Sequence, residues 1–420
     1  MKTLVIGTGG REHTLALALS RDPSVTEVHA APGNPGIAQV ATLHEVDPLD
    51  GAAVADLAAS LAVDLVVVGP EAPLVAGVAD AVRARGIAVF GPSGEAAALE
   101  GSKAFAKDVM AAAEVPTAMA HVCETAEEVA AALDAFGAPY VVKDDGLAAG
   151  KGVVVTDDRE AAAAHAAQCE RVVIEEYLDG PEVSLFALCS YTESDGATVV
   201  PLQPAQDFKR AYDDDAGPNT GGMGAYTPLP WAPDDLVDEV TRRVLQPTVD
   251  EMAKRGRPFT GLLYAGLALT SRGLRVVEFN ARFGDPETQA LMALLDSPLG
   301  ALLAGAADGT LAEVPAPRWR DGAAVTVVVA AEGYPASPRK GDVITGVEAA
   351  DAVEGVDVIH AGTARDEAGN LVTAGGRVLT VTARGTDLAD ARRRAYEAVD
   401  LIHIDGGFSR RDIAAKAALV

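Results

Sequence analysis

The sequence contains few cysteines and no long uninterrupted apolar segment. Its three cysteines, Cys123, Cys169 and Cys189, lie far apart and form no CxxC pair, a pattern typical of reduced cytosolic thiols. No segment approaches the roughly 18 consecutive apolar residues that a membrane-spanning helix needs. The first residues lead from an apolar run directly into glycines, unlike a secretory signal. These absences predict a cytoplasmic protein without a membrane partner.

Basic residues are also scarce. The chain has 34 Lys and Arg against 61 Asp and Glu, a formal net charge of -27. A field of this sign repels nucleic acid and anionic lipid, so neither is an expected partner. Any phosphate ligand must then be held by locally placed glycines, lysines and arginines. The 420 residues, 49% of them hydrophobic, suffice for about three domains with full cores.

The first hundred residues contain four apolar segments that each end in turn residues. These are KTLVI before GTGG, TEVHAA before PGNPG, DLVVV before GPEAP, and IAVF before GPS. Alanine-rich stretches that separate them, such as residues 74–85, are typical of helices. The alternation predicts a parallel sheet with right-handed crossovers. Ligands bind beyond the carboxyl ends of such strands, where all four loops should form one rim.

A different pattern begins near Gly101. TAEE at residues 125–128 predicts a capping box that opens a helix running to Phe136 and ending at Gly137. PYVVK and VVVT then flank the loop DDGLAAGKG as a hairpin, and RVVIEEYL and EVSLFALCSY supply two more strands. We expect a small, mostly antiparallel lobe over about residues 122–190.

Three later segments complete the organisation. The polar, glycine-rich residues 207–226 form a long segment of a kind that is usually functional or disordered. LLYAGLALT and LRVVEFN predict a hairpin turning at residues 271–273, before NARFGDPETQ leads into a helix. Beyond about residue 320, further strands and a helix near 387–399 indicate a small α+β closing domain.

The loop at residues 144–152 has the composition of a polyphosphate site. Glycines let backbone N–H groups approach phosphates, and the flanking Lys143 and Lys151 add point charges. The motif is not GxxxxGK[ST], because Gly152 follows Lys151. A flexible hairpin tip with incidental lysines remains the alternative for this segment alone.

The segment RVVEFNARFGDPETQ carries a candidate metal site. Glu278 and Asn280 are two apart on a strand and share a face, and their oxygens suit Mg²⁺. If the strand persists, Arg282 continues the alternation and can stabilise charge that develops in phosphoryl transfer. The alternative is a half-buried strand edge with solvated polar residues, which the phosphate loop elsewhere in the chain disfavours.

Together these segments resemble the ATP-grasp superfamily and, within it, the glycinamide ribonucleotide synthetase (phosphoribosylamine–glycine ligase) family. The resemblance rests on VIGTGGREH, APGN, VGPEAPLV, FGP, LEGSKAFAK, DGLAAGKGV, IEEYLDGPE, GPNTGGMGAY, EFNARFGDPETQ and GYP, in the family's order. The tail, with HAGT, GGRV and IHIDGGFSRRDI, is similar too. The implied α/β ATP-grasp fold has an N-terminal parallel-sheet domain (1–101), an ATP-grasp domain (102–320) with a mobile antiparallel lid lobe (about 122–190), and a small C-terminal α+β domain (321–420).

The resemblance also implies a reaction. ATP phosphorylates the carboxylate of glycine, and the amine of 5-phosphoribosylamine attacks the glycyl phosphate to give glycinamide ribonucleotide, ADP and phosphate in de novo purine biosynthesis. The implied cofactors are ATP and Mg²⁺ or Mn²⁺, and the implied partners are the two small-molecule substrates.

Roles carry over from the family to matching positions. The nucleotide site would comprise Lys103, Lys143, Gly146, Gly150, Lys151, Gly152, Glu175, Glu176, Tyr177, Leu178 and Glu182. The metal ligands would be Glu278 and Asn280. The catalytic group would comprise Asp207, Lys209, Arg282 and Asp285. The substrate pocket would comprise Gly9, Gly10, Arg11, Glu12, Asn34, Pro70, Glu71, Gly221, Gly222, Met223 and Gly224.

Three positions depart from the family. Asp144 stands where the family usually has alanine, and strand alternation from Lys143 predicts that it points away from the phosphates. Phe208 replaces the histidine of Asp-His-Lys-Arg, so no acid–base role is expected there. The strand LLYAGLALT lacks the metal-binding glutamate of many relatives, which predicts a sparse protein-derived metal shell.

The opening GTGGREH favours a single phosphate over a dinucleotide. Glu12 falls where GxGxxG needs its third glycine, and the acidic residue expected about 20 positions on is missing. We therefore expect this helix N-terminus to bind the 5-phosphate of phosphoribosylamine. A dehydrogenase does not fit this loop, and another ATP-grasp ligase or a biotin-carboxylase-like enzyme leaves GTGGREH, GPEAPLV and GPNTGGMGAY unexplained. A non-enzymatic nucleotide sensor stays an alternative, although the presence of Glu278, Asn280 and Arg282 favours turnover.

Overall fold

The computed structural model describes residues 1–147 and 152–419. Its N-terminal part is a parallel sheet of β1 (Lys2–Gly7), β2 (Glu27–Pro32), β3 (Thr42–Leu43), β4 (Leu65–Val68) and β5 (Ala88–Phe90), in the order β3-β2-β1-β4-β5. Helices α1 (Gly10–Ser20), α2 (Gly51–Leu61), α3 (Glu71–Val75) and α4 (Val78–Ala84) connect the strands. The predicted parallel sheet is confirmed. Within the described residues, no helix has the length and apolarity to cross a membrane.

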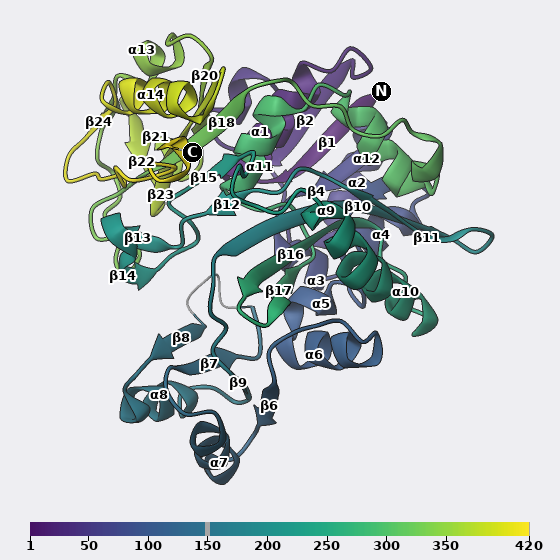
Figure 1. Cartoon of the computed structure of the whole chain (residues 1–420). Helices are drawn as coiled ribbons and strands as arrows, with labels where there is room; N and C mark the ends of the chain where they lie inside the picture. Colours follow the sequence, from purple (N-terminus) through teal and green to yellow (C-terminus); the bar gives the residue numbers. More distant parts are fainter. Residues whose placement is uncertain (148–151, 420) are drawn as a thin grey trace.

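A small antiparallel lobe follows α5 (Ala98–Gly101) and α6 (Lys103–Ala112) and projects from the body of the molecule (Figure 1). It contains β6 (Ala120–Cys123), β7 (Tyr140–Asp144), β8 (Val153–Thr156) and β9 (Val172–Glu175), in the order β6-β9-β7-β8, with α7 (Ala126–Phe136) and α8 (Arg159–Ala166). The hydroxyl of Thr125 and the carboxylate of Glu128 form the predicted capping box of α7, and Gly137 ends it. The predicted β7–β8 hairpin is confirmed as well.

The central sheet is antiparallel and consists of β10 (Glu182–Thr192), β11 (Gly196–Pro201), β16 (Gly261–Thr270) and β17 (Gly273–Asn280), in the order β11-β10-β16-β17. The predicted β16–β17 hairpin is confirmed. EVSLFALCSY forms β10 and pairs with β16, so its assignment to the small lobe is wrong. Eight consecutive residues of β10 are buried and need apolar cover on both faces, which the central body supplies.

The glycine-rich segment between the central sheet and the closing domain is more ordered than expected. It forms β12 (Gln206–Asp207), β13 (Arg210–Tyr212), β14 (Ala216–Asn219) and β15 (Gly224–Thr227). Strands β12 and β15 extend the C-terminal sheet β12-β15-β18-β23-β20, whose other members are β18 (Ala323–Ala330), β20 (Val356–His360) and β23 (Arg377–Gly385). Because β12 and β15 belong to this sheet, the glycine-rich segment is fixed to the closing domain.

Helices cover these sheets. After β15 the chain forms α9 (Leu236–Val240), a short π-helix (Thr241–Leu245) and α10 (Gln246–Lys254). Helices α11 (Glu287–Leu294) and α12 (Leu299–Asp308) follow β17, and α14 (Leu388–Val399) follows β23, as predicted. The remaining closing-domain elements are β19 (Ile344–Thr345), α13 (Val347–Asp351), β21 (Thr363–Arg365), β22 (Leu371–Thr373) and β24 (His403–Ile404).

Candidate active site

One large cavity of about 1230 Å³ lies where all these parts meet. Eighteen of the predicted residues line it: Arg11, Glu71, Lys103, Lys143, Gly146, Gly152, Glu175, Glu176, Tyr177, Leu178, Glu182, Asp207, Lys209, Gly221, Glu278, Asn280, Arg282 and Asp285. Eight do not: Gly9, Gly10, Glu12, Asn34, Pro70, Gly222, Met223 and Gly224. Gly150 and Lys151 lie outside the described residues. Segments separated by hundreds of residues therefore meet at one site.

A buried carboxylate holds two lysines at the mouth of the small lobe. Glu175 Oε2 lies 2.8 Å from Lys143 Nζ, and Glu175 Oε1 lies 3.0 Å from Lys107 Nζ. Lys143 also donates to Val277 O at 3.0 Å. Lys103 donates to Gly146 O at 2.9 Å. The side chain of Glu175 thus positions lysines, and only its backbone is available to contact an adenine.

The lysines differ in electrostatics. Burial opposes the charge of Lys143, but Glu175 and Glu278 outweigh it and raise the pKa of that ammonium. Burial lowers the pKa of Lys103. The next strand residue, Asp144, does not line the cavity. It lies near Cys169 instead, whose pKa is raised mainly by burial and then by the Asp144 carboxylate. The predicted outward orientation of Asp144 agrees with this placement.

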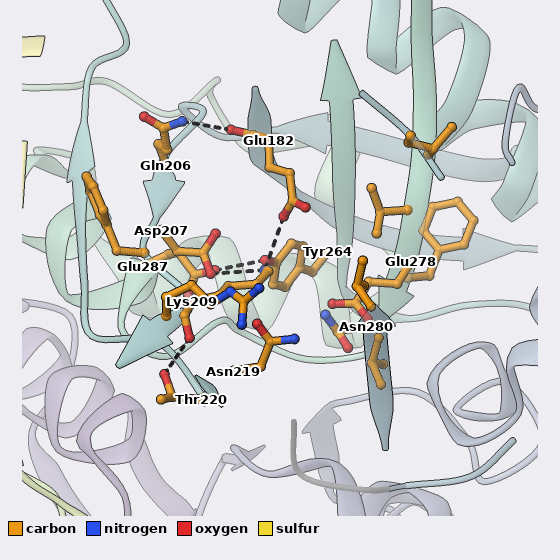
Figure 2. Close-up of a pocket in the computed structure, with 18 of the residues that line it drawn as sticks. Glu182, Gln206, Asp207, Lys209, Asn219, Thr220, Tyr264, Glu278, Asn280 and Glu287 are labelled. Atoms are coloured by element: carbon orange, nitrogen blue, oxygen red, sulfur yellow. Dashed lines mark hydrogen bonds and ion pairs between the residues drawn. The ribbon is translucent and has the colours of Figure 1, made fainter. Parts of the chain in front are cut away.

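Glu278 and Asn280 project from β17 into the cavity (Figure 2). Burial would raise the pKa of Glu278, but Lys209, Lys143 and Lys103 outweigh it and lower that pKa, so the carboxylate is ionised. No hydrogen bond or ion pair joins either side chain to another residue in the described part of the chain. Nor do three His, Cys, Asp or Glu side chains come together there as a metal site. Two oxygen donors that leave room for water and phosphate oxygens fit Mg²⁺.

Arg282 is held by carboxylates from two other segments. Strand β17 ends at Asn280, so the strand alternation does not reach Arg282. Its Nε lies 3.2 Å from Glu71 Oε2, and its Nη2 lies 3.0 Å from Glu100 Oε1. Burial opposes its charge, but Glu100 and Glu71 outweigh it and raise its pKa. The guanidinium therefore reaches the cavity already paired and fixed in orientation.

A second polar cluster lies beside the central sheet (Figure 2). Lys209 Nζ donates to Asp207 Oδ2 at 3.0 Å and lies 3.8 Å from Glu182. Deeper, Tyr264 donates to Glu287 Oε1 at 2.8 Å. Burial opposes the charge of Lys209, but Asp207, Tyr264 and Glu182 hold its pKa well above the usual range. Burial and Asp207 raise the pKa of Glu287.

Phe208, the departure from the family pattern, lines the cavity beside Asp207 and Lys209. The guanidinium carbon of Arg410 lies 4.9 Å from the centre of its ring. Arg410 itself is fully buried and paired with Asp412 and Asp215. Phe208 thus packs the glycine-rich segment against the C-terminal tail, without a group for proton transfer.

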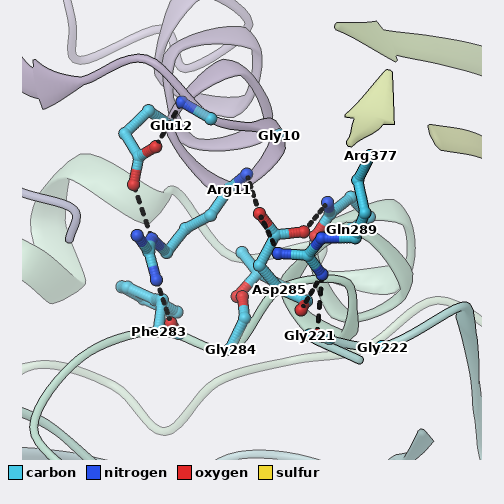
Figure 3. Close-up of polar contacts among 12 residues, drawn as sticks. Gly10, Arg11, Glu12, Gly221, Gly222, Phe283, Gly284, Asp285, Gln289 and Arg377 are labelled. Atoms are coloured by element: carbon cyan, nitrogen blue, oxygen red, sulfur yellow. Dashed lines mark hydrogen bonds and ion pairs between the residues drawn. The ribbon is translucent and has the colours of Figure 1, made fainter. Parts of the chain in front are cut away.

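The GTGGREH loop satisfies its own N–H groups with carboxylates (Figure 3). Glu12 Oε2 accepts the Gly9 N–H at 2.6 Å, and Asp285 Oδ2 accepts the Arg11 N–H at 3.3 Å. Arg11 alone among the loop residues lines the cavity. A carboxylate repels a phosphate, so the loop's remaining attraction for an anion lies in Arg11 and the helix N-terminus.

Other predicted substrate residues have structural roles. The side chain of Asn34 donates to Thr8 O at 2.8 Å and to His360 O at 3.0 Å, which joins the N-terminal loop to the closing domain. Met223 is fully buried against Val328 and Ala330. Asn34 and Met223 are buried, and neither lines the cavity.

Arg377 connects the closing domain to the site (Figure 3). Its Nη1 donates to Gly221 O at 2.7 Å and to Asp285 O at 2.6 Å, and its Nη2 lies 3.5 Å from Asp285 Oδ2. Burial would raise the pKa of Asp285, but Arg377 and Arg11 outweigh it and lower that pKa. Asp285 is therefore an ionised carboxylate at the cavity wall.

The lining residues that were not assigned from the sequence include Glu100, Lys107, Tyr264, Glu287 and Arg377. Lys107 follows Lys103 by one helical turn within LEGSKAFAK, a spacing that places both on one face. Glu287 belongs to GDPETQ and Arg377 to GGRV, two segments of the family resemblance. Tyr264 lies within an apolar strand and had no comparable signal.

The parallel N-terminal sheet, the antiparallel lobe and the lysine-lined cavity beside the central sheet define an ATP-grasp enzyme. Family models of phosphoribosylglycinamide synthetase match the chain over its N domain (residues 1–100), ATP-grasp (A) domain (101–288) and C domain (324–416). The chain belongs to the phosphoribosylamine–glycine ligase family.

Individual relatives agree with this membership. The phosphoribosylamine–glycine ligase of Streptomyces coelicolor is 68% identical over 420 residues, which is 100% of both chains. That of Mycobacterium tuberculosis is 56% identical over 427 residues, covering 100% of this chain and 99% of the relative. The crystal structure of the Thermotoga maritima ligase has a TM-score of 0.84 at 34% identity and covers 99% of this chain and 100% of that one.

More distant structures share the fold. The biotin carboxylase domain of the Hydrogenobacter thermophilus 2-oxoglutarate carboxylase, crystallised with MgADP, ADP and bicarbonate, has a TM-score of 0.71 at 17% identity. It covers 97% of this chain and 91% of its own.

Proposed function

We propose that the chain joins glycine to 5-phosphoribosylamine at the expense of ATP, through glycyl phosphate, as a cytoplasmic enzyme of purine biosynthesis. The observation that carries the proposal is the single cavity. It combines buried lysines with an ionised Asp285 beside Arg377. It also contains Glu278 and Asn280 of β17, whose side chains form no ion pair or hydrogen bond within the described residues. Phosphoryl transfer needs this kind of positioning and charge neutralisation more than covalent help from the protein.

The nucleotide lies between the small lobe and the central sheet in this proposal. Lys103 and Lys143 hold the phosphates together with the loop after β7, and the backbone of residues 175–178 faces the adenine. Glu182, whose pKa burial raises, meets the ribose hydroxyls. The support is that Lys103, Lys143, Gly146, Gly152, Glu182 and residues 175–178 all line the cavity. Glu175 keeps Lys143 from adopting other orientations.

Glu278 and Asn280 would hold Mg²⁺ or Mn²⁺. When bound, such an ion neutralises charge on phosphate oxygens. The other charges come from the chain itself. Arg282, fixed by Glu71 and Glu100, faces the developing charge without having to reorganise.

The acyl transfer then requires two substrates to lie in line. An oxygen of the glycine carboxylate attacks the γ-phosphorus, and ADP leaves. The amine of phosphoribosylamine next attacks the acyl carbon, and phosphate leaves. We assign Asp207 and Lys209 to the glycine side, since they form a fixed pair at 3.0 Å. Asp285 lies on the phosphoribosylamine side, where it can accept the proton that the amine loses.

We assign the 5-phosphate of phosphoribosylamine to the space beside the GTGGREH loop. Arg11 lines the cavity there, and Arg377 adds a second guanidinium next to Asp285. Two arginines offset the carboxylates of Glu12 and Asp285, which would otherwise repel the phosphate.

A phosphate-release assay tests the proposed function. It uses ATP, Mg²⁺ and freshly generated phosphoribosylamine, with glycine, alanine, serine or bicarbonate as the carboxylate. We expect release that depends on both glycine and phosphoribosylamine, with formation of a glycinamide product by mass spectrometry. Equal release with alanine or with bicarbonate would overturn the assignment, and so would release unaffected by phosphoribosylamine.

A further inference from the structure

We propose that a second cavity, separate from the active site, binds a small phosphate monoester. This cavity has a volume of about 330 Å³, within the range of small-molecule sites, which begins at about 300 Å³. It lies between α1, the end of α11 and the closing-domain strands β20 and β23. None of the catalytic residues assigned above lines it.

The cavity gathers basic side chains in a strongly acidic chain. Arg21, Arg318, Arg320 and Arg384 line it, opposed by Asp22, Asp296 and Asp357. The carboxylate of Asp22 accepts the N–H groups of Ser24 at 2.8 Å and Gly300 at 2.7 Å and is therefore occupied internally. Four arginines from three segments face three aspartates, which leaves one surplus positive charge in a chain that carries -27 overall.

Arg384 is the unsatisfied member of this group. Arg21 pairs with Asp357 at 2.6 Å, and Arg320 pairs with Asp296 at 3.6 Å. The guanidinium of Arg384 has no ion pair or hydrogen bond to any of residues 1–147 and 152–419. Burial is the main cause that lowers the pKa of Arg384, and the nearby charges of Arg320 and Arg21 lower it further. Asp357 acts in the opposite direction but does not outweigh them. An anion between these guanidinium groups would relieve their repulsion and accept charge-assisted hydrogen bonds.

Gln289 supplies a second, uncharged requirement. It is 1% exposed and lines the cavity. Its Nε2 donates to Asp285 Oδ1 at 2.8 Å (Figure 3), and its Oε1 is buried without a partner in the described part of the chain. Asp285 fixes which way the amide points, because only Nε2 can donate. A ligand hydroxyl that reached Oε1 would supply the missing donor.

These two requirements together specify the ligand class. Within the described residues, Arg384 lacks an anionic partner, and Gln289 Oε1 lacks a hydrogen-bond donor. A phosphate monoester of a small polyol has both within one molecule. Gln289 thus lies between this cavity and the active-site Asp285, which accepts its Nε2–H.

Tryptophan fluorescence reports on this cavity selectively. The chain has two tryptophans. Trp231 lines the active site, and Trp319 stands between Arg318 and Arg320 and bridges to Leu295 of the cavity wall. In the Trp231→Phe variant, the emission of Trp319 is followed during titration with glycerol 3-phosphate, inorganic phosphate or NaCl at matched ionic strength.

We expect a saturable change with glycerol 3-phosphate that NaCl does not produce. Arg384→Gln in the same background should weaken binding about tenfold, the effect of one lost charge-assisted hydrogen bond. Arg393→Gln is the matched control, since it removes an exposed arginine of the same domain that lies outside the cavity, and it should titrate like its parent. If Arg384→Gln does not fold, Arg320→Gln takes its place.

The comparison of glycerol 3-phosphate with inorganic phosphate also distinguishes a phosphate ester from free phosphate as the ligand. Tighter binding of glycerol 3-phosphate than of inorganic phosphate supports an ester that reaches Gln289, and equal binding identifies free phosphate as the ligand of the same site. A response to NaCl of equal size would overturn the proposal. Unchanged binding in the folded arginine variants would do the same.

Discussion

The carboxylate of Glu278 stays ionised inside the protein because three lysines face it. Lys103 comes from α6, Lys143 from β7 and Lys209 from the segment between β12 and β13, and each is held by another carboxylate or a carbonyl group. The charges of the site are therefore mutually supported, so that removal of one leaves its partners unbalanced. Replacement of one of these residues should therefore disturb its charged partners as well as the catalytic step.

Glu278→Gln should lower kcat on the order of a hundredfold, because it removes a charge from the metal site but little volume. The exposed Glu397→Gln, with the same change in charge, serves as the control and should keep the wild-type rate. The measurement is kcat as a function of Mg²⁺ concentration, together with the thermal unfolding midpoint. Wild-type turnover of Glu278→Gln at ordinary Mg²⁺ would refute the ligand role.

The buried His13 should make the free energy of unfolding depend on pH. Burial, then His360, lowers the pKa of His13 from 6.5 to about 3. The unfolded chain binds this proton near pH 6.5 and the folded chain only near pH 3, so the free energy of unfolding falls as the pH falls between those values. One such group contributes up to about 1.4 kcal/mol per pH unit.

Replacement of this group should flatten the pH dependence. In the native protein the backbone N–H of His360 donates to His13 Nδ1 at 2.7 Å. In His13→Asn the side-chain amide oxygen can accept this hydrogen bond, but the amide does not titrate. Urea unfolding between about pH 5 and 8 measures the slope. An unchanged slope in this variant would assign the acid sensitivity to other groups.

At the scale of elements, helix α1 shows how local pattern and tertiary contact combine. The glycines before it form the predicted strand–turn–helix. Its capping groups, however, are Glu12 from its own first turn and Asp285 from far along the chain. The sequence thus indicates an anion-binding geometry, and the fold decides how much of it is left for a ligand.

Gly9→Val tests the role of this element. A Cβ at Gly9 would lie 2.8 Å from Glu12 Oε2 and 3.6 Å from Asp285 Oδ2, so a larger side chain must displace the carboxylates beside the proposed phosphate position. We expect a higher KM for phosphoribosylamine and an unchanged KM for ATP. Steady-state kinetics with each substrate varied in turn measures both, and a change confined to ATP would reverse the assignment.

On the scale of the whole molecule, three sheets and a small lobe enclose one site while the chain carries a formal charge of -27. Most of that charge lies on the surface, where acidic groups repel one another. The large cavity is lined by nine lysines and arginines and by twelve aspartates and glutamates, so its lining is acidic as well. Attraction of an anionic ligand therefore depends on where individual lysines and arginines lie, such as Lys103, Lys143 and Arg282, and not on the net charge of the cavity.

Salt should stabilise this protein. Raising NaCl from about 0.01 to 0.15 M shortens the screening length from roughly 30 to 8 Å, which weakens the net repulsion more than the short ion pairs. We expect the thermal unfolding midpoint to rise over this range. Calorimetry with sucrose as an uncharged control measures it, and a midpoint that falls with NaCl would show that ion pairs outweigh the net charge.

The sequence by itself determined the local elements and the chemistry they can carry. Alternation and turn residues specify the parallel strands, the capping box of α7 and the β16–β17 hairpin, because these depend on neighbours within a few residues. The tertiary structure decided which groups face one another. Glu175 binds Lys107 and Lys143, Arg282 is held by Glu71 and Glu100, and β10 joins the central sheet. No local pattern contains these pairings, because each arises from packing between segments that are distant along the chain.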